Sequence, residues 1–318
     1  MNERMAIWRT WWTKYYPGPW IRPVKVAATV FALGLMGSVL LSNWATIDYT
    51  HLRFDLISML IALLILWMTV WLGALAWAEI VRALYPDARF RQTIRQHQLS
   101  HLTKYLPGMA WQQVSKAVQL HRSGLTADRI GLAVVLELGL VVLTGLLTVV
   151  LILGLTRMSI LGLVPSPFLV WGLAIAILSV CVSAPFIVLR MIGDRFASMR
   201  HRRNLIFNLW LVELIQIVGW LNHGVALWFL CRAFTPIESD KIPYLVIAAI
   251  MPVLVGLVIF IVPNGFGVRE LTMTSLLQVI LPTPLAVTTS VMTRTALILA
   301  EMAGAVSVLI VNMFHRHT

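Results

Sequence analysis

The stretch that decides the fold class is residues 55–80, DLISMLIALLILWMTVWLGALAWAEI, whose only charged residues, Asp55 and Glu79, stand near its two ends. An α-helix needs about 20 apolar residues to cross the roughly 30 Å hydrocarbon core of a bilayer, and this stretch is long enough. Runs of the same character occur at residues 25–44, 131–155, 168–189, 205–231, 243–263 and 285–312. The pattern predicts an all-α, polytopic integral membrane bundle with about seven to eight membrane segments.

The composition agrees with lipid as the surrounding solvent. Hydrophobic residues make up 59% of the 318-residue chain and charged residues only 12%, whereas soluble domains carry about 25% charged residues. We therefore expect residues 1–318 to form a single integral membrane domain. The formal net charge of +12 is explained by basic cytoplasmic loops, so we expect no nucleic acid partner.

The basic residues alternate from one connection to the next, which predicts the orientation of the chain. Lys and Arg are frequent in residues 1–25, 81–130 and 190–203 and sparse in the intervening connections. Because cytoplasmic loops are enriched in Lys and Arg, the N-terminus is predicted to be cytoplasmic, with the aromatic-rich segment 1–24 at the interface. The C-terminus is cytoplasmic if residues 264–283 cross the membrane and external if they only dip in and return; we expect the crossing.

The basic connection at 81–130 contains a helix-like sequence that a Pro-Gly pair interrupts: HLTKYLPGMAWQQ, residues 101–113. Pro107 and Gly108 stop the first helix, in which apolar residues form a rough stripe. A second helix restarts directly after them. The connection is therefore predicted to hold two helices joined by a tight turn.

Two arrangements of this pair are open. The helices could lie flat on the cytoplasmic surface, or residues 93–122 could form a re-entrant hairpin with the Pro-Gly pair at its buried tip. In the re-entrant hairpin, the free N–H groups of the second helix, near Trp111, would point at the tip beside Lys104. Such an arrangement binds anions, and a lipid phosphate is the obvious anion inside a membrane.

A second turn, VPNGFGVRE at residues 262–270, raises the same possibility. Its Asn264, Gly265 and Gly267 suit the positive φ angles of a tight turn. A short helix, VRELTMTSLLQVIL, is predicted directly after it at residues 268–281. The turn and helix together are predicted to be a second broken or re-entrant element.

The first residues of this short helix carry opposite charges. Glu270 suits the positive N-terminal end of the helix, whereas Arg269 opposes it. Arg269 therefore either faces a bound anion or a carboxylate, or extends to the membrane interface. If it faces an anion, the turn at Asn264–Arg269, within the Gly-rich segment 263–282, would supply the opposing half of the phosphate site.

The motifs KYLPGMAW and PNGFGVRE, in this order, resemble the paired motifs of the flippase-like membrane domain of lysylphosphatidylglycerol synthases and its stand-alone relatives. The usual forms are close to K-Y-[IL]-P-G-x-x-W and P-G-G-x-G-x-R-E. Asn264 stands where a glycine is common, but asparagine tolerates left-handed backbone geometry. The resemblance covers nearly the whole chain.

The resemblance implies handling of lipids or lipid-linked glycans, with movement of a phosphate-bearing lipid between leaflets as the leading function. The expected partners are membrane lipids, either an anionic phospholipid or a polyprenyl-phosphate-linked substrate, in a bacterial or archaeal plasma membrane. No segment resembles the soluble aminoacyl-transferase domain of the synthases, so lysylphosphatidylglycerol synthesis is not expected. The candidate phosphate-binding residues are Lys104, Pro107, Gly108, Trp111, Asn264, Gly265, Gly267, Arg269, Glu270 and Arg294.

Polar residues inside the apolar spans are further candidates, because a charge there costs about 2.5–3.5 kcal/mol on insertion scales. One interpretation is structural, with interhelical ion pairs in which Arg294 is neutralised by Glu137 or Glu213. The other is a polar cavity for a phosphorylated headgroup, or a proton relay. These intramembrane candidates are Glu137, Glu213, Gln216, His223 and Glu301.

Three classes of function remain open from the sequence. A transporter-like lipid translocase leads, and a multi-span polyprenyl-phosphate-dependent glycosyltransferase is supported only by Asp48 and Asp55 in a short external loop. A non-catalytic scaffold for a lipid- or glycan-modifying enzyme is the third, and a homodimer is compatible with all of them. The sequence has no phosphate loop and no Cys/His cluster of zinc spacing, so we expect no cofactor and no metal.

Overall fold

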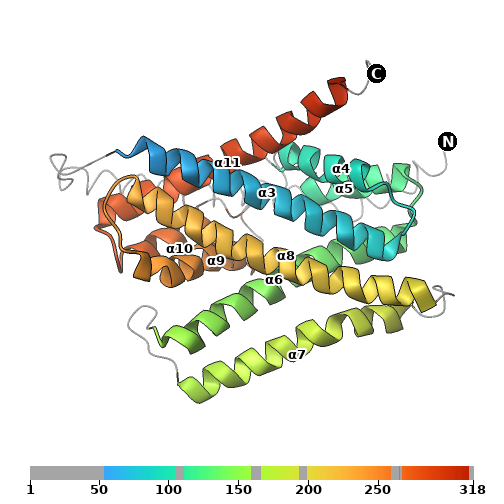
Figure 1. Cartoon of the computed structure of the whole chain (residues 1–318), viewed down its shortest axis with the longest axis horizontal. Coiled ribbons are helices and arrows are strands. Elements are labelled where there is room, and N and C mark those ends of the chain that lie inside the picture. Colours follow the sequence, from blue (N-terminus) through green and yellow to red (C-terminus); the bar gives the residue numbers. More distant parts are fainter. Residues whose placement is uncertain are drawn as a thin grey trace, which may run out of the picture.

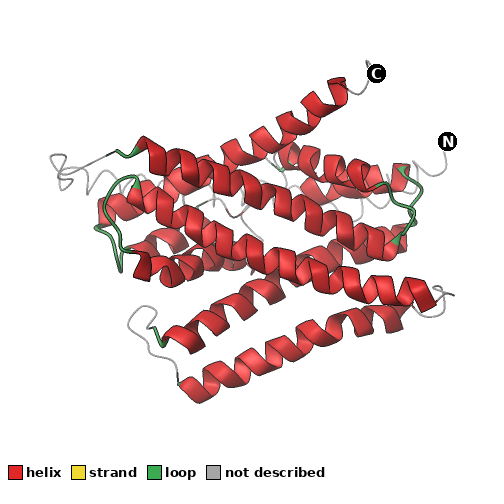
Figure 2. Cartoon of the chain, in the orientation of Figure 1, coloured by secondary structure: helices red, strands yellow, loops and turns green. Residues whose placement is uncertain are grey.

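The computed structural model describes residues 54–104, 111–158, 166–192, 199–258, 265 and 267–314. Within these ranges the chain is a bundle of helices without a strand (Figure 1, Figure 2). The predicted first span at 25–44 and the interfacial segment 1–24 lie outside the described residues.

Six helices in the described part of the chain are long and apolar enough to cross a membrane. They correspond to the remaining predicted spans, with small differences at their ends. These helices are α3 (Leu56–Leu84), α6 (Ala127–Thr156), α7 (Pro167–Ile192), α8 (Met199–Arg232), α9 (Ile242–Val258) and α11 (Thr283–Phe314). The prediction of an all-α, polytopic membrane protein is therefore confirmed.

Helix α3 begins at a side-chain cap. The Asp55 carboxylate accepts hydrogen bonds from the Ile57 N–H at 3.0 Å and from the Ser58 hydroxyl at 2.6 Å. The hydrogen bond from Ser58 is the main reason why the pKa of Asp55 is lowered. The carboxylate is therefore charged at neutral pH and satisfies a backbone donor that has no partner within the helix.

Helices α3 and α8 form the centre of the bundle, and α7 lies at its edge (Figure 1). Helix α11 runs beside α3 in the same direction, and its Ala296 joins an apolar cluster with Leu66 and Val70 of α3. Helix α7 leaves large apolar side chains such as Phe168 and Trp171 exposed. This surface is what lipid would cover in a membrane.

Two shorter helices, α4 (Phe90–Thr103) and α5 (Trp111–Arg122), fold into the bundle. Helix α4 packs against α3, α5 and α11, and it reaches the middle of α3, because Gly304 of α11 faces both Gln98 and Val70. Helices that lay flat on a surface would not reach this depth. The predicted tip, Pro107 and Gly108, lies outside the described residues.

The buried face of α4 is polar. Among its apolar residues, Leu102 is exposed. Helix α4 instead buries polar side chains: Thr93, Gln96, His97, Gln98 and Ser100. The periodicity of apolar residues does not identify the buried face of such a helix, because its polar side faces the protein interior.

Helix α9 and the short helix α10 (Val268–Leu277) form an antiparallel hairpin. Near its open end the Tyr244 hydroxyl donates to the Leu276 carbonyl at 2.7 Å, and near its closed end Arg269 packs against Gly256. Helix α10 has 10 residues, about 15 Å, which is too short to cross a bilayer alone. Helix α10 therefore begins inside the bundle.

Helix α10 is also shorter than the predicted helix at 268–281. The residues after Leu277 form a tighter turn, in which the Ile280 N–H donates to the Leu277 carbonyl at 3.0 Å. Pro282 follows, and the residue before a proline is biased away from helical geometry. The chain then enters α11 at the same end of the bundle.

Helices α8 and α9 approach closely at Gly224, and a substitution there tests this contact. A Cβ at Gly224 would lie 2.5 Å from the Val246 Cα, whereas a Cβ at Gly219 in the same helix would meet nothing within 4 Å. Gly224→Ala should lower the unfolding midpoint measured by heating the purified protein in detergent, since overpacking costs about 1–3 kcal/mol. Gly219→Ala should leave the midpoint unchanged or raise it. Equal midpoints for the two variants would contradict this helix packing.

Candidate functional site

Helix α11 brings the two broken-helix segments together. Its Glu301 forms an ion pair with Lys104, which directly follows α4. Its Arg294 lies beside Glu270 of α10, with 3.6 Å between Nε and Oε1. Residues seven apart share a helix face and are about 10 Å apart along the axis. The end of α4 and the start of α10 therefore meet one face of α11, roughly two turns apart.

The neighbour of Arg294 corrects one expectation. Glu137 or Glu213 was expected to neutralise Arg294, but Glu270 lies beside it. Glu137 is instead paired with Lys116, at 2.5 Å between Oε1 and Nζ. That interpretation was wrong because the hairpin of α9 and α10 carries Glu270 into the bundle, and span positions alone do not show this tertiary arrangement.

The start of α10 is held by its glutamate. The Gly267 N–H donates to the Glu270 carboxylate at 2.6 Å, and the Ser290 hydroxyl of α11 donates to the Glu270 backbone carbonyl at 2.9 Å. Gly265 and Gly267 both have positive φ, 65° and 83°, as predicted for this turn. Asn264 lies outside the described residues.

The side chain of Arg269 lies against α9 inside the bundle. Its side chain covers Gly256 and Gly265, and a Cβ at Gly256 would come within 2.6 Å of the Arg269 Nε. The two glycines thus leave the space that the arginine occupies. Of the two alternatives for Arg269, this position favours a carboxylate or an anion as its neighbour over the membrane interface.

A narrow cavity lies beside this turn. Its polar lining residues come from three helices: His223 of α8, Arg269 and Glu270 of α10, and Ser290, Thr293 and Arg294 of α11. Its volume is about 40 Å³, which holds about three water molecules. A phospholipid headgroup would enter only if the surrounding helices moved apart.

We define the central cluster as Lys104, Arg269, Glu270, Arg294 and Glu301. Both arginines act electrostatically on Lys104, so the charges lie close enough to be considered together. Three positive and two negative charges leave the cluster with a net charge of +1 (3 − 2). The neighbouring turns that the structure does not describe, residues 105–110 and 259–264, add no acidic residue. An excess cation inside an apolar bundle favours an anion beside it.

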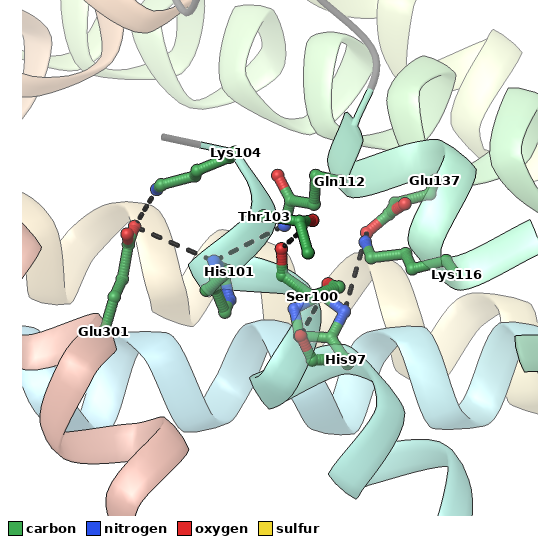
Figure 3. A network of polar contacts seen from close by, with 9 residues as sticks. All are labelled: His97, Ser100, His101, Thr103, Lys104, Gln112, Lys116, Glu137 and Glu301. Atoms are coloured by element: carbon green, nitrogen blue, oxygen red, sulfur yellow. Dashed lines mark hydrogen bonds and ion pairs between the residues drawn. The ribbon is translucent and has the colours of Figure 1, made fainter. Parts of the chain in front are cut away.

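A second buried ion pair lies beside α4, nearer to the start of that helix than the central cluster (Figure 3). Lys116 of α5 pairs with Glu137 of α6 and lies over the Trp77 ring at 4.5 Å. His97 stands 3.8 Å from the same carboxylate oxygen of Glu137. His101 stands 3.8 Å from the Glu301 carboxylate. Polar groups therefore connect the two ion pairs.

The remaining predicted residues lie outside the central cluster. Trp111 is the first residue of α5. Gln216 and Trp220 of α8 both hydrogen-bond the Thr144 hydroxyl of α6, each at 3.2 Å, which ties two spans together. Glu213 is buried on α8 but does not line the narrow cavity.

Sequence reasoning missed His97, His101, Gln112 and Lys116. The two histidines are four residues apart, a spacing that places them on one helix face. The signal was therefore present in the sequence. Hydropathy does not distinguish it, because α4 is rich in polar residues throughout and has the composition of an exposed helix.

Comparison with known proteins supports a relationship over most of the chain. Residues 24–303 match the model of a family described as the lysylphosphatidylglycerol synthase TM region. The match includes both turn motifs and all residues of the central cluster. None of the curated proteins compared with the chain matches it. The matched family suggests a function related to membrane lipids. The protein belongs to the family of the lysylphosphatidylglycerol synthase transmembrane region.

Proposed function

We propose that the protein is a lipid translocase, which moves a phosphate-bearing lipid between the leaflets and binds its phosphate at the central cluster. The observation that carries the proposal is the net positive charge where α4 and α10 meet α11. The lipid-related family supports it. The substrate class is an anionic phospholipid or a polyprenyl-phosphate-linked lipid, which share the phosphate.

The basic side chains suit a phosphate for two reasons. The planar guanidinium groups of Arg269 and Arg294 can each donate two parallel hydrogen bonds to phosphate oxygens, and Lys104 adds a compact charge. The start of α10 adds a partial positive charge and backbone N–H donors. Few other anions are available at this depth in a membrane.

The two carboxylates of the central cluster would act as competitors of the lipid. Glu301 pairs with Lys104, and Glu270 lies beside Arg294, so a phosphate would displace carboxylates from the same cations. Release of the lipid would restore these pairs. The cations are then never left alone in an apolar environment, which would cost several kcal/mol.

The moving parts would be the broken helices. Helix α4 ends and helix α10 begins inside the bundle, and fewer than ten residues separate each of them from its partner helix, whereas α11 runs continuously past both. Because α10 and α11 both line the narrow cavity, a shift of α10 relative to α11 would widen it. Such a shift moves a half-helix against a continuous helix and does not require the long spans to separate.

The packing and the positive-inside rule together give the proposed orientation. The end of α3 leads into the basic connection 81–130, which is proposed to be cytoplasmic. Because α11 runs parallel to α3, the end of α11 is proposed to be cytoplasmic too. The open end of the α9–α10 hairpin would then face outwards.

Cysteine labelling tests this orientation. Ser239→Cys precedes α9 and Gln278→Cys follows α10, and both positions are exposed. A membrane-impermeant maleimide should label both in intact cells, whereas Asp87→Cys, between α3 and α4, should react only after permeabilisation. The native Cys181 and Cys231 are buried and give the background. Labelling of Ser239→Cys but not Gln278→Cys from outside would contradict a hairpin that returns to its starting side.

Lipid movement tests the function itself. Purified protein in liposomes should speed the transfer of fluorescent phosphatidylglycerol between leaflets, measured with a membrane-impermeant quencher. Arg294→Ala should slow this transfer at least about tenfold, since one charged hydrogen bond to the phosphate contributes roughly 1.5–3 kcal/mol. Lys241→Ala removes a surface lysine that pairs only locally with Asp240 and should have no effect.

A double substitution separates loss of function from loss of folding. Lys104→Met alone would leave Glu301 buried without this partner, at a cost of about 3–5 kcal/mol. Lys104→Met combined with Glu301→Gln removes both charges, so it should restore thermal stability but not lipid transfer. If wild type moves no lipid with any headgroup tested, the proposal fails, and the transferase and scaffold functions become the alternatives.

A further inference from the structure

Helix α4 carries a polar stripe that leads to Lys104, and its other members do not belong to the central cluster. Successive members of the stripe are alternately three residues and one residue apart, which places them on one face of the helix. They are Thr93, Gln96, His97, Ser100, His101 and Lys104. Its members from Thr93 to Ser100 are buried. A helix inside a membrane protein buries such a stripe at a cost, so polar residues there mark a functional path by default.

The two histidines form the middle of this stripe (Figure 3). Their rings lie edge to face with 4.9 Å between the centroids. His97 is 3.8 Å from the Glu137 carboxylate, and His101 is 3.8 Å from the Glu301 carboxylate. The pair therefore bridges the space between two lysine–glutamate ion pairs, one of which belongs to the central cluster.

A polar cavity opens at the other end of the stripe. Thr93 and Gln96 line it together with Asp87, Arg89 and other residues of the α3–α4 and α5–α6 connections, and its volume is about 300 Å³. This volume holds several water molecules. His97 follows Gln96 directly, so water in this cavity lies within about one helical turn of the histidine pair.

We propose that His97 and His101 bind a proton that reaches them from this polar cavity, and that this proton is coupled to phosphate binding at the central cluster. The inference rests on the proposed lipid function and supplies its driving ion. The site is chemically suited to protons, because imidazole is the side chain that gains and loses a proton nearest neutral pH.

The coupling follows from the position of Glu301. When His101 is neutral, Glu301 pairs with Lys104 and the central cluster carries a charge of +1. A proton taken up at His101 places a second cation beside Glu301, raises the charge of the site to +2, and weakens the hold of Glu301 on Lys104. Lys104 is then available to the phosphate. Binding of the anion and uptake of the proton therefore favour each other.

Other groups around the pair set its proton affinity. Helix α3 presents the Trp77 ring and Gly73, and α5 presents Lys116 and Gln112. The charged neighbours from the other elements are Glu137 of α6, Glu301 of α11 and Lys104 after α4. Burial, and after it the two lysines, lower the pKa of both histidines well below its usual value, so the neutral form is favoured before a phosphate binds. The two nearby carboxylates act in the opposite direction. An arriving phosphate adds negative charge and tips this balance towards the protonated form.

The direction of the pH effect is fixed by this scheme. The protonated form binds the phosphate more tightly, so affinity should rise as pH falls through the range in which the pair titrates. One proton per lipid limits the rise to about tenfold per pH unit. The phosphate of phosphatidylglycerol keeps one negative charge over this range, so the pH dependence belongs to the protein.

The test is binding of a fluorescent, short-chain phosphatidylglycerol to the purified full-length protein in neutral detergent, followed by anisotropy from pH 5.5 to 8.5. Wild type should bind several-fold more tightly at the acidic end. His101→Gln should still bind but with a flat profile, and His97→Gln should flatten it too. His121→Gln is the matched control, since His121 contacts the Leu125 carbonyl outside the stripe, and it should keep the wild-type profile.

The outcomes separate the two proposals. Binding that is independent of pH in wild type, or equally pH-dependent in His101→Gln and His97→Gln, overturns the proton site but leaves the lipid site standing. No binding of the probe by wild type at any pH contradicts the lipid site, and the proton coupling with it. Thermal melting of each variant shows that it is folded before binding is compared.

Discussion

The ion pair between Lys104 and Glu301 is the contact on which the rest of the site depends. It joins the end of α4 to α11, and both side chains are largely buried. A single buried charge left without its partner costs several kcal/mol, so α4 cannot slide along α11 or leave it without replacing this interaction. The pair thus holds a half-helix at the centre of a bundle whose other contacts are mostly apolar.

The position of α4 then determines what the interior can do. When the end of α4 is held at Glu301 of α11, the polar face of α4 is turned inwards. His97 and His101 then lie between the two ion pairs. The hairpin of α9 and α10 reaches the same helix from the opposite end and places Glu270 beside Arg294. Two half-helices therefore converge on one continuous helix. This is how a membrane protein can present helix ends and charges at mid-depth while the long spans keep the backbone satisfied in lipid.

Much of the fold followed from the sequence, because length and hydropathy determine which segments can cross a bilayer. The spans from α3 to α11, the turn at Gly265 and Gly267, and the break between α4 and α5 were all predicted from local signals. Local signals were insufficient for α4. Its apolar residues form only a rough stripe, and burial of the polar face depends on partners such as Glu137 and Glu301, which come from distant parts of the chain.

The same reason explains the misassigned neighbour of Arg294. A span shows that a charge is buried but not which helix lies opposite, and the hairpin that carries Glu270 inwards is a tertiary feature. Arg294 and Glu301 are about 10 Å apart along one helix axis, and each lies beside an oppositely charged residue from another segment, Glu270 and Lys104.

The most direct measurement is competition between two lipids that differ only in the phosphate. Native mass spectrometry of the purified protein with dioctanoyl phosphatidic acid and dioctanoylglycerol gives the bound fraction of each. If the central cluster binds phosphate, the phosphate-bearing lipid is retained by wild type, and the preference disappears in the Lys104→Met, Glu301→Gln, Arg294→Ala triple variant. Equal retention of both lipids by wild type, or an unchanged preference in the variant, would contradict a phosphate site at this cluster.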